Sequence, residues 1–178
     1  MNSIDKQQQE DNLANLVGGD AVEKIRELAN KAKTCFFCTH ATTQTPFSTR
    51  PMAVQKIDDS GVFWFLSSND SHKNAEILQD PSVQLFFQGS AHSDFMTLYG
   101  HATISQDKAK IKELWEPLMK TWFTEGEDDP RISVIRFVPE DGHYWDTKHG
   151  AFVAFAKQVT GAVLGKTLDD SIQGSLKV

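Results

Sequence analysis

The sequence contains little cysteine, no long apolar run and no apolar segment near its start. Its two cysteines follow a polar, glutamine-rich stretch over residues 1–12, which lacks the apolar centre of a secretory signal. We therefore expect reduced thiols and a cytoplasmic protein. The longest apolar stretches fall far short of the roughly 20 residues that cross a membrane as a helix, so we expect no membrane partner.

Positive charge is also scarce. The chain has 18 Lys and Arg against 24 Asp and Glu, a net charge of −6. This balance argues against a nucleic acid as partner, because neutralising a phosphate backbone requires a basic surface. A few cations that converge on one small phosphate remain compatible with it. Hydrophobic residues make up 39% of the 178 residues, which suffices for one domain with an ordinary core.

Several motifs of well-known chemistry are absent. The chain has no P-loop, GxGxxG, GxSxG or HExxH motif, so the sequence identifies no catalytic residue. Cys35 and Cys38 have the CxxC spacing of redox pairs and half zinc sites. In a strand, however, residues three apart point to opposite faces, and no second pair completes a zinc site. We therefore predict a structural role for the two thiols and no metal site.

Apolar patterning and turn residues predict a mostly β chain with flanking helices. Strands are predicted over residues 35–39, 47–57, 62–66, 83–87, 95–104, 132–138 and 143–146. Helices are predicted from Asp20, from Asp70 or Ser71, from Asp107 and over residues 150–164. This order predicts a six- to seven-stranded, mostly antiparallel barrel. We expect a flexible arm over residues 1–18, one domain over residues 19–165 and a polar tail over residues 166–178.

One polar cluster suits a phosphate. A strand ends at Ser67 and leads into a helix start that carries Ser71, His72 and Lys73. Exposed N–H groups at a helix start point at an anion, and a lysine pairs with it. The alternative is that Ser71 only caps the helix and Lys73 only faces solvent.

The four tryptophans divide by position. Trp64 lies in the middle of a strand, and Trp115 and Trp122 share one predicted helix face, which favours packing for all three. Trp145 ends a strand, where an indole ring can cover a flat ligand. The sequence thus offers one aromatic candidate for stacking on a ring system.

Taken in order, these segments resemble the pyridoxamine-phosphate oxidase family, and more closely its general stress protein branch. The similarity covers about residues 20–147. It is carried by Arg50-Pro51-Met52, Trp64-Phe65-Leu66-Ser67, Ser71-His72-Lys73-Asn74-Ala75-Glu76-Ile77, Trp115-Glu116-Pro117, Trp122-Phe123, Glu125-Gly126-Glu127-Asp128-Asp129-Pro130 and His143-Tyr144-Trp145-Asp146.

The resemblance implies a split β-barrel homodimer that holds FMN between its subunits, with FAD as the other candidate cofactor. By this likeness Arg50, Pro51 and Met52 lie along the isoalloxazine ring, and Ser67, His72 and Lys73 lie at the phosphate. Trp145, and also Trp115, would reach the flavin from the partner subunit. The predicted cofactor-binding set is completed by Phe65 and Ser71.

The chain departs from the family pattern in two places. The oxidases have an Arg-x-His pattern shortly after the tryptophan that matches Trp145, whereas here the sequence continues Asp146-Thr147-Lys148-His149-Gly150-Ala151. The strand before Gly100 also lacks the family's flavin-facing glutamine, and Phe95 or a neighbour stands there. We therefore do not expect oxidation of pyridoxamine phosphate.

Three functions are compatible with these residues. The first is an FMN-dependent oxidoreductase of the general stress protein type, with an unidentified substrate. The second is a flavin-binding reservoir or sensor without turnover, and the third is a haem- or deazaflavin-binding relative on the same barrel. One fold supports all three, so the bound group separates the third function from the first two, and turnover separates the first from the second.

Overall fold

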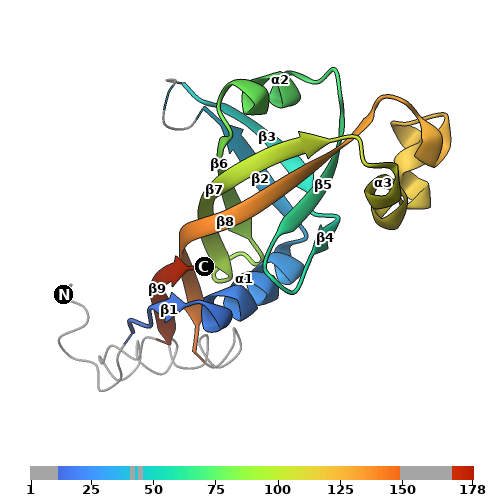
Figure 1. Ribbon diagram of the computed structural model, residues 1–178. Coiled ribbons are helices and arrows are strands. Elements are labelled where there is room, and N and C mark those ends of the chain that lie inside the picture. The colour runs from blue at the N-terminus through green and yellow to red at the C-terminus, as the bar shows by residue number, and fades with distance from the viewer. Residues whose placement is uncertain (1–11, 41–42, 44–45, 149–169) are drawn as a thin grey trace.

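The computed structural model describes residues 12–40, 43, 46–148 and 170–178 (Figure 1). The strands are β1 (Leu16–Val17), β2 (Thr34–Thr39), β3 (Ser48–Ala53), β4 (Lys56–Ile57), β5 (Phe63–Ser68), β6 (Ser82–Gln88), β7 (Phe95–Ser105), β8 (Ile132–Thr147) and β9 (Ser171–Lys177). The helices are α1 (Gly19–Ala32), α2 (His72–Gln79) and α3 (Lys108–Leu114), with 3-10 turns η2 (Pro117–Thr121) and η3 (Gly126–Asp128).

The strands form one curved sheet in which β8 is the pivot. The order is β1-β9-β8-β7-β6-β2-β3, and β5 adds to β8 with β4 on its far side. The first half of β8 lies between β5 and β7, and its second half lies between β7 and β9. All these pairs are antiparallel except β1 with β9. Around the barrel the strands run β4-β5-β8-β7-β6-β2-β3, and the two terminal strands, β3 and β4, do not pair with each other. The barrel is therefore open between them, and the predicted mostly antiparallel split barrel is confirmed.

The number of strands differs from the prediction for three reasons. The segment 47–57 is two strands, β3 and β4, whose partners are β2 and β5 respectively. The segments 132–138 and 143–146 belong to the single strand β8, which continues through Pro139 because β7 shifts register opposite it at Tyr99 and Gly100. The sheet also gains β1 and β9 from the ends of the described chain.

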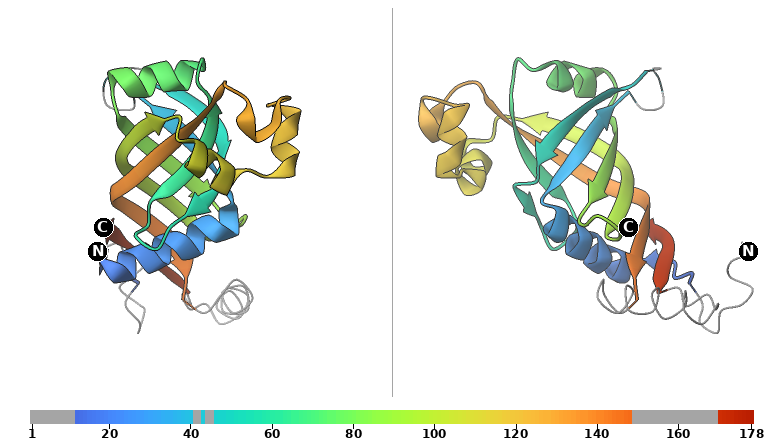
Figure 2. Two further views of the ribbon diagram at one scale, coloured as in Figure 1. Left: turned by 45° about the vertical axis from the view of Figure 1, so that its right-hand side comes forward. Right: turned by 180° about the vertical axis from the view of Figure 1, so that it is seen from behind.

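Helix α1 covers one end of the barrel and α2 the other (Figures 1 and 2). Helix α1 begins after Gly18, whose φ of 61° suits glycine. The predicted cap Asp20 therefore lies inside the first turn of α1. Ile25 and Leu28, one turn apart, are fully buried against the barrel interior. That interior is aromatic. Its fully buried rings include Phe37, Phe63, Phe65, Phe137 and Tyr144.

A smaller apolar cluster holds the segment between β7 and β8 against the outside of β5 and β8. Ile111 and Leu114 of α3 are buried there with Met119 and Phe123. The predicted single helix face through Trp122 is wrong, because α3 ends at Leu114 and Pro117 begins a 3-10 turn. Leu118 and Trp122 are exposed as a result.

Both ends of the described chain join the sheet. Ala14 lies so close to β9 that a side chain at Gly174 would meet its carbonyl oxygen, and the Tyr144 hydroxyl donates to the same oxygen at 2.8 Å. The predicted helix over residues 150–164 lies outside the described residues. None of the helices in the described ranges has the length and hydrophobicity needed to cross a membrane.

Candidate functional site

The start of α2 is built on a buried asparagine that the sequence analysis did not single out. The Asn74 side-chain oxygen accepts hydrogen bonds from the Ser67 and Ser71 hydroxyls at 3.1 and 3.2 Å, and its amide donates to Ser133 at 2.7 Å. Ser71 is the N-cap residue, but its side chain bonds no backbone N–H group of the helix. The Asn74 and Ala75 N–H groups donate to the Ser71 carbonyl, so His72 and Lys73 carry the N–H groups of the first turn that lack an acceptor within the helix.

Lys73 is a half-buried cation at this helix start. Among the residues that the structure describes, none forms a hydrogen bond or an ion pair with its ammonium group. Burial lowers the pKa of Lys73, and the nearby Arg50 guanidinium lowers it further. The Asp70 and Glu76 carboxylates raise the pKa of Lys73 without reversing this direction, and a bound anion would relieve the remaining repulsion between Lys73 and Arg50.

Arg50 is anchored toward α2 by a polar group around Glu76. Its guanidinium donates to Glu76 at 2.6 Å and to Thr39 at 2.7 Å. Ser48 also donates to Glu76, at 2.9 Å. Burial alone would raise the pKa of Glu76, but the hydrogen bonds from Thr39, Ser48 and Arg50 lower it. Because a guanidinium has five N–H donors, Arg50 keeps donors free for a ligand.

The outer face of the sheet carries an apolar groove of about 520 Å³. It lies over β2, β3, β6, β7 and the end of β8, and its exposed aromatic rings include Phe36, Phe86 and Trp145, which are 57%, 38% and 44% exposed. Pro51 lines the same groove. The volume of the groove is in the range of small-molecule binding sites. The groove also exposes aromatic side chains to water, and such exposed apolar patches are typical of binding sites and interfaces.

The structure divides the predicted cofactor-binding residues among four places. Arg50 and Lys73 lie together beside the bonded pair Ser67 and Ser71, and His72 is exposed at the same helix start. Pro51 and Trp145 meet in the groove.

The remaining predicted residues pack elsewhere. Phe65 is fully buried, with its ring 5.4 Å from that of Phe37, and Met52 packs against the same core. Trp115 packs on the smaller cluster beside α3. Sequence reasoning missed Asn74, Glu76 and Thr39 as partners of the polar site. The spacing of Lys73 and Glu76 suggests a pair between those two, whereas the Glu76 carboxylate pairs with Arg50, so no local signal pointed to these partners.

The two cysteines are free and buried in β2. Burial raises the pKa of Cys35 to about 12, so this residue is a neutral thiol near pH 7. The Cys38 sulfur lies 2.9 Å from the Thr49 hydroxyl. No group of three or more potential metal ligands occurs within the described ranges.

Two curated relatives show significant similarity. Protein bli-3 of Neurospora crassa is 25% identical over 126 residues, which are 66% of this chain and 60% of the relative. General stress protein 26 of Bacillus subtilis is 27% identical over 78 residues, 42% of this chain and 55% of the relative. The matches thus span little more than half the length of either relative.

Solved structures share the fold. A protein of Jannaschia sp. CCS1 assigned to general stress protein 26 superposes with a TM-score of 0.72 over 89% of this chain and 98% of its own, at 19% identity. The general stress FMN/FAD binding protein of Xanthomonas citri is 25% identical, with a TM-score of 0.59 over 68% of this chain and 85% of its own. The family model for pyridoxamine 5'-phosphate oxidase like proteins matches residues 20–169. The chain belongs to this pyridoxamine 5'-phosphate oxidase like family.

Proposed function

We propose that this protein binds FMN, with the phosphate at the start of α2 and the flavin ring in the groove. The observation that carries the proposal is the Lys73 ammonium, which is half-buried beside Arg50 without a partner among the described residues. A cation held in this way costs free energy unless an anion joins it. The N–H groups at the start of α2 suit phosphate oxygens, and the Ser67 and Ser71 hydroxyls would each turn their single hydrogen from Asn74 to the ligand.

The position of β3 supports one ligand that spans both places. β3 pairs only with β2, so its other edge is free among the described residues. Arg50 lies on the α2 side of this edge and Pro51 lies in the groove. A phosphate and a flat ring connected by a short chain can therefore contact both faces across the edge of β3. The FMN/FAD-binding relative from Xanthomonas citri supports a flavin as that ligand.

We further propose a homodimer in which the groove is the shared surface. Aromatic rings as exposed as Phe36 and Trp145 usually mark an interface. A twofold axis would bury the same face of both subunits and create two equivalent sites, with Trp145 of the partner subunit over each ring.

When bound, a flavin supplies hydride and electron transfer, and the protein orients it. We propose an oxidoreductase whose substrate is not identified. The second candidate is a flavin-binding reservoir or sensor without turnover. Stopped-flow oxidation of the photoreduced protein by candidate acceptors separates the two. In a reservoir, the acceptor would reoxidise the bound flavin no faster than it reoxidises free reduced FMN.

The absorbance spectrum of the purified protein tests the proposal. Flavin bands near about 370 and 450 nm are expected, and mass spectrometry of the released group distinguishes FMN from FAD. A Soret band instead would identify a haem protein. A colourless protein that fails to bind added FMN or FAD would overturn the proposal.

A further inference from the structure

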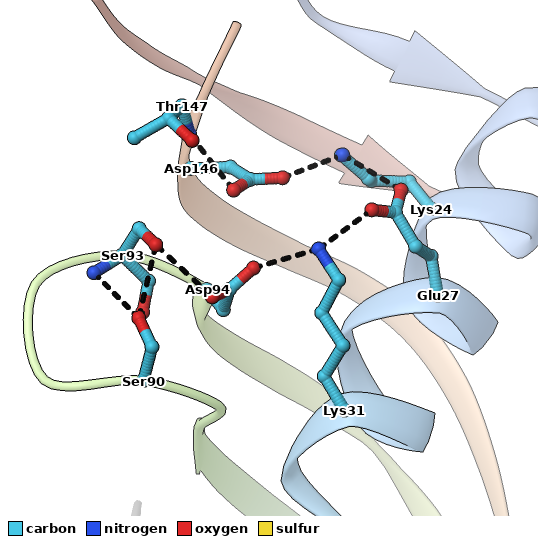
Figure 3. Close-up of polar contacts among 8 residues, drawn as sticks. All are labelled: Lys24, Glu27, Lys31, Ser90, Ser93, Asp94, Asp146 and Thr147. Atoms are coloured by element: carbon cyan, nitrogen blue, oxygen red, sulfur yellow. Dashed lines mark hydrogen bonds and ion pairs between the residues drawn. The ribbon is translucent and has the colours of Figure 1, made fainter. Parts of the chain in front are cut away.

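A continuous chain of ion pairs joins α1 to the strands that carry the groove aromatics (Figure 3). Lys24 contacts Asp146 at 2.7 Å and Glu27 at 2.8 Å, and Lys31 contacts Glu27 at 2.9 Å and Asp94 at 2.8 Å. The order is therefore Asp146–Lys24–Glu27–Lys31–Asp94. These residues line a polar cavity of about 400 Å³.

The two aspartates are the fixed ends of this chain. Their side chains are 13% (Asp94) and 5% (Asp146) exposed. Asp94 also accepts from the Ser93 hydroxyl at 3.0 Å, and Asp146 accepts from the Thr147 N–H at 2.7 Å. Each carboxylate is thus held from its own strand end and from the helix, and losing the lysine would leave a buried charge uncompensated.

Each aspartate is the direct neighbour of a groove aromatic. Asp94 precedes Phe95 and Asp146 follows Trp145, and Phe95 and Trp145 are paired across β7 and β8. Both aromatic residues line the groove. Successive side chains of a strand point to opposite faces. The ion pairs therefore lie on one face of these strand ends, and the aromatic pair lies on the other. Asp94 also has a φ of 60°, a conformation that a non-glycine residue keeps only when its contacts hold it.

We propose that Lys24 and Lys31 of α1 are positioning residues for Phe95 and Trp145, and thereby for the ring of the bound flavin. The part that concerns the ring rests on the proposed function. The lysines fix the backbone on either side of the aromatic pair, so the indole and the phenyl ring are held in one arrangement before a ligand arrives. Ligand affinity then depends on a helix that does not itself line the groove.

The experiment reads Trp145 directly in ligand-free protein. Tryptophan is replaced by 5-fluorotryptophan, and the Trp145 resonance is assigned with Trp145→Phe. Lys24→Met and Lys31→Met should each shift or broaden this resonance and leave those of Trp115 and Trp122 unchanged. The matched control is Arg26→Met, which removes a cation of the same helix whose partner, Asp59, is exposed. If a lysine variant does not fold, Glu27→Gln takes its place, because it is a milder change at a more exposed position of the same chain of ion pairs.

FMN affinity is then measured by fluorescence titration on the same variants. A loss of roughly three- to tenfold is expected for Lys24→Met and Lys31→Met, and none for Arg26→Met. An unchanged Trp145 resonance in folded variants would overturn the positioning role. A changed resonance with unchanged FMN affinity would overturn the connection to the ligand. If the parent protein binds no flavin while the resonance still responds, the proposed function fails and the positioning of Trp145 stands.

Discussion

Arg50 and Pro51 are consecutive in β3, yet they act on opposite faces of the sheet. The Arg50 guanidinium bonds Glu76 of α2, whereas Pro51 lines the groove with Trp145. Strand alternation causes this separation. The edge of β3 therefore lies between a cationic site and an aromatic one, which gives each of them a separate experimental test.

Replacing Lys73 by methionine should weaken FMN binding and stabilise the ligand-free protein. A charge-assisted contact with phosphate contributes about 1.5–3 kcal/mol, so the affinity should fall roughly ten- to a hundredfold. The pKa of Lys73 is lowered in the folded state, so its charge opposes folding at neutral pH. The gain in melting temperature should therefore be full near pH 7 and vanish as the pH rises through the ordinary lysine pKa of 10.5.

Lys108→Met is the control for this variant, because it removes one exposed lysine outside the site. It should change neither the fluorescence titration nor the melting temperature appreciably. Equal FMN affinity in Lys73→Met and the parent would rule out the phosphate site at α2.

Glu76→Gln tests the anchoring of Arg50 through pH. The pKa of Glu76 is lowered by its hydrogen bonds from Thr39, Ser48 and Arg50, so the ionised carboxylate stabilises the folded state. That contribution is present above the ordinary pKa of 4.5 and is lost as the pH falls through the lower folded-state value. In urea titrations the parent should be more stable than Glu76→Gln near neutral pH, and the difference should shrink in acid. A difference that does not change with pH would contradict an ionised Glu76 partner for Arg50.

Gly100→Ala should destabilise the barrel strongly. A Cβ at this position would lie 2.0 Å from the Val138 carbonyl oxygen, where β7 and β8 shift register. Neither backbone can retreat without breaking the ladder, so we expect a loss of about 3 kcal/mol in the free energy of unfolding. Gly19→Ala is the control, because its Cβ meets no atom within 4 Å and lies in a helix. It should be neutral or stabilising by about 0.5 kcal/mol.

The protein should not oxidise pyridoxamine phosphate at a measurable rate. The segment after Trp145 lacks the Arg-x-His pattern with which, by the family resemblance, the oxidases hold that substrate. The assay adds FMN in excess and follows pyridoxal phosphate over time. Product formed in proportion to protein concentration would show that other residues hold the substrate.

Patterns in the sequence predicted the barrel because alternation and turn residues act locally. The turn between the predicted strands 47–57 and 62–66 forms at Asp58, whose carboxylate accepts from the N–H groups of Ser60 and Val62 in its own turn. The helix predicted from Asp70 or Ser71 ends at Gln79, shortly before Pro81, because proline cannot continue a helix. The pairing of β1 with β9 was missed because it joins segments about 160 residues apart, and nothing local records such a contact.

The candidate site was predictable only in part. Ser71 and Lys73 lie at the start of a helix, a position that the local sequence pattern of a capping residue indicates. The partnership of Arg50 with Glu76 and the contact of Lys24 with Asp146 depend on how distant elements pack, so spacing could not indicate them. Treating Arg50, Pro51 and Met52 as one unit also concealed the fact that alternate residues face opposite ways.

Flavin binding should depend on dimerisation through the groove. Phe36→Glu places a charge among exposed rings that a second subunit would cover, so it should shift the protein to a monomer in equilibrium sedimentation. Half a site keeps the phosphate contacts but leaves the ring in water, so the monomer should bind FMN much more weakly. FMN should in turn favour the parent dimer by mass action. Val17→Glu adds the same charge at an exposed residue outside the groove and should leave both measurements unchanged. A monomeric Phe36→Glu that still binds FMN as tightly as the parent would show that each subunit holds the flavin alone.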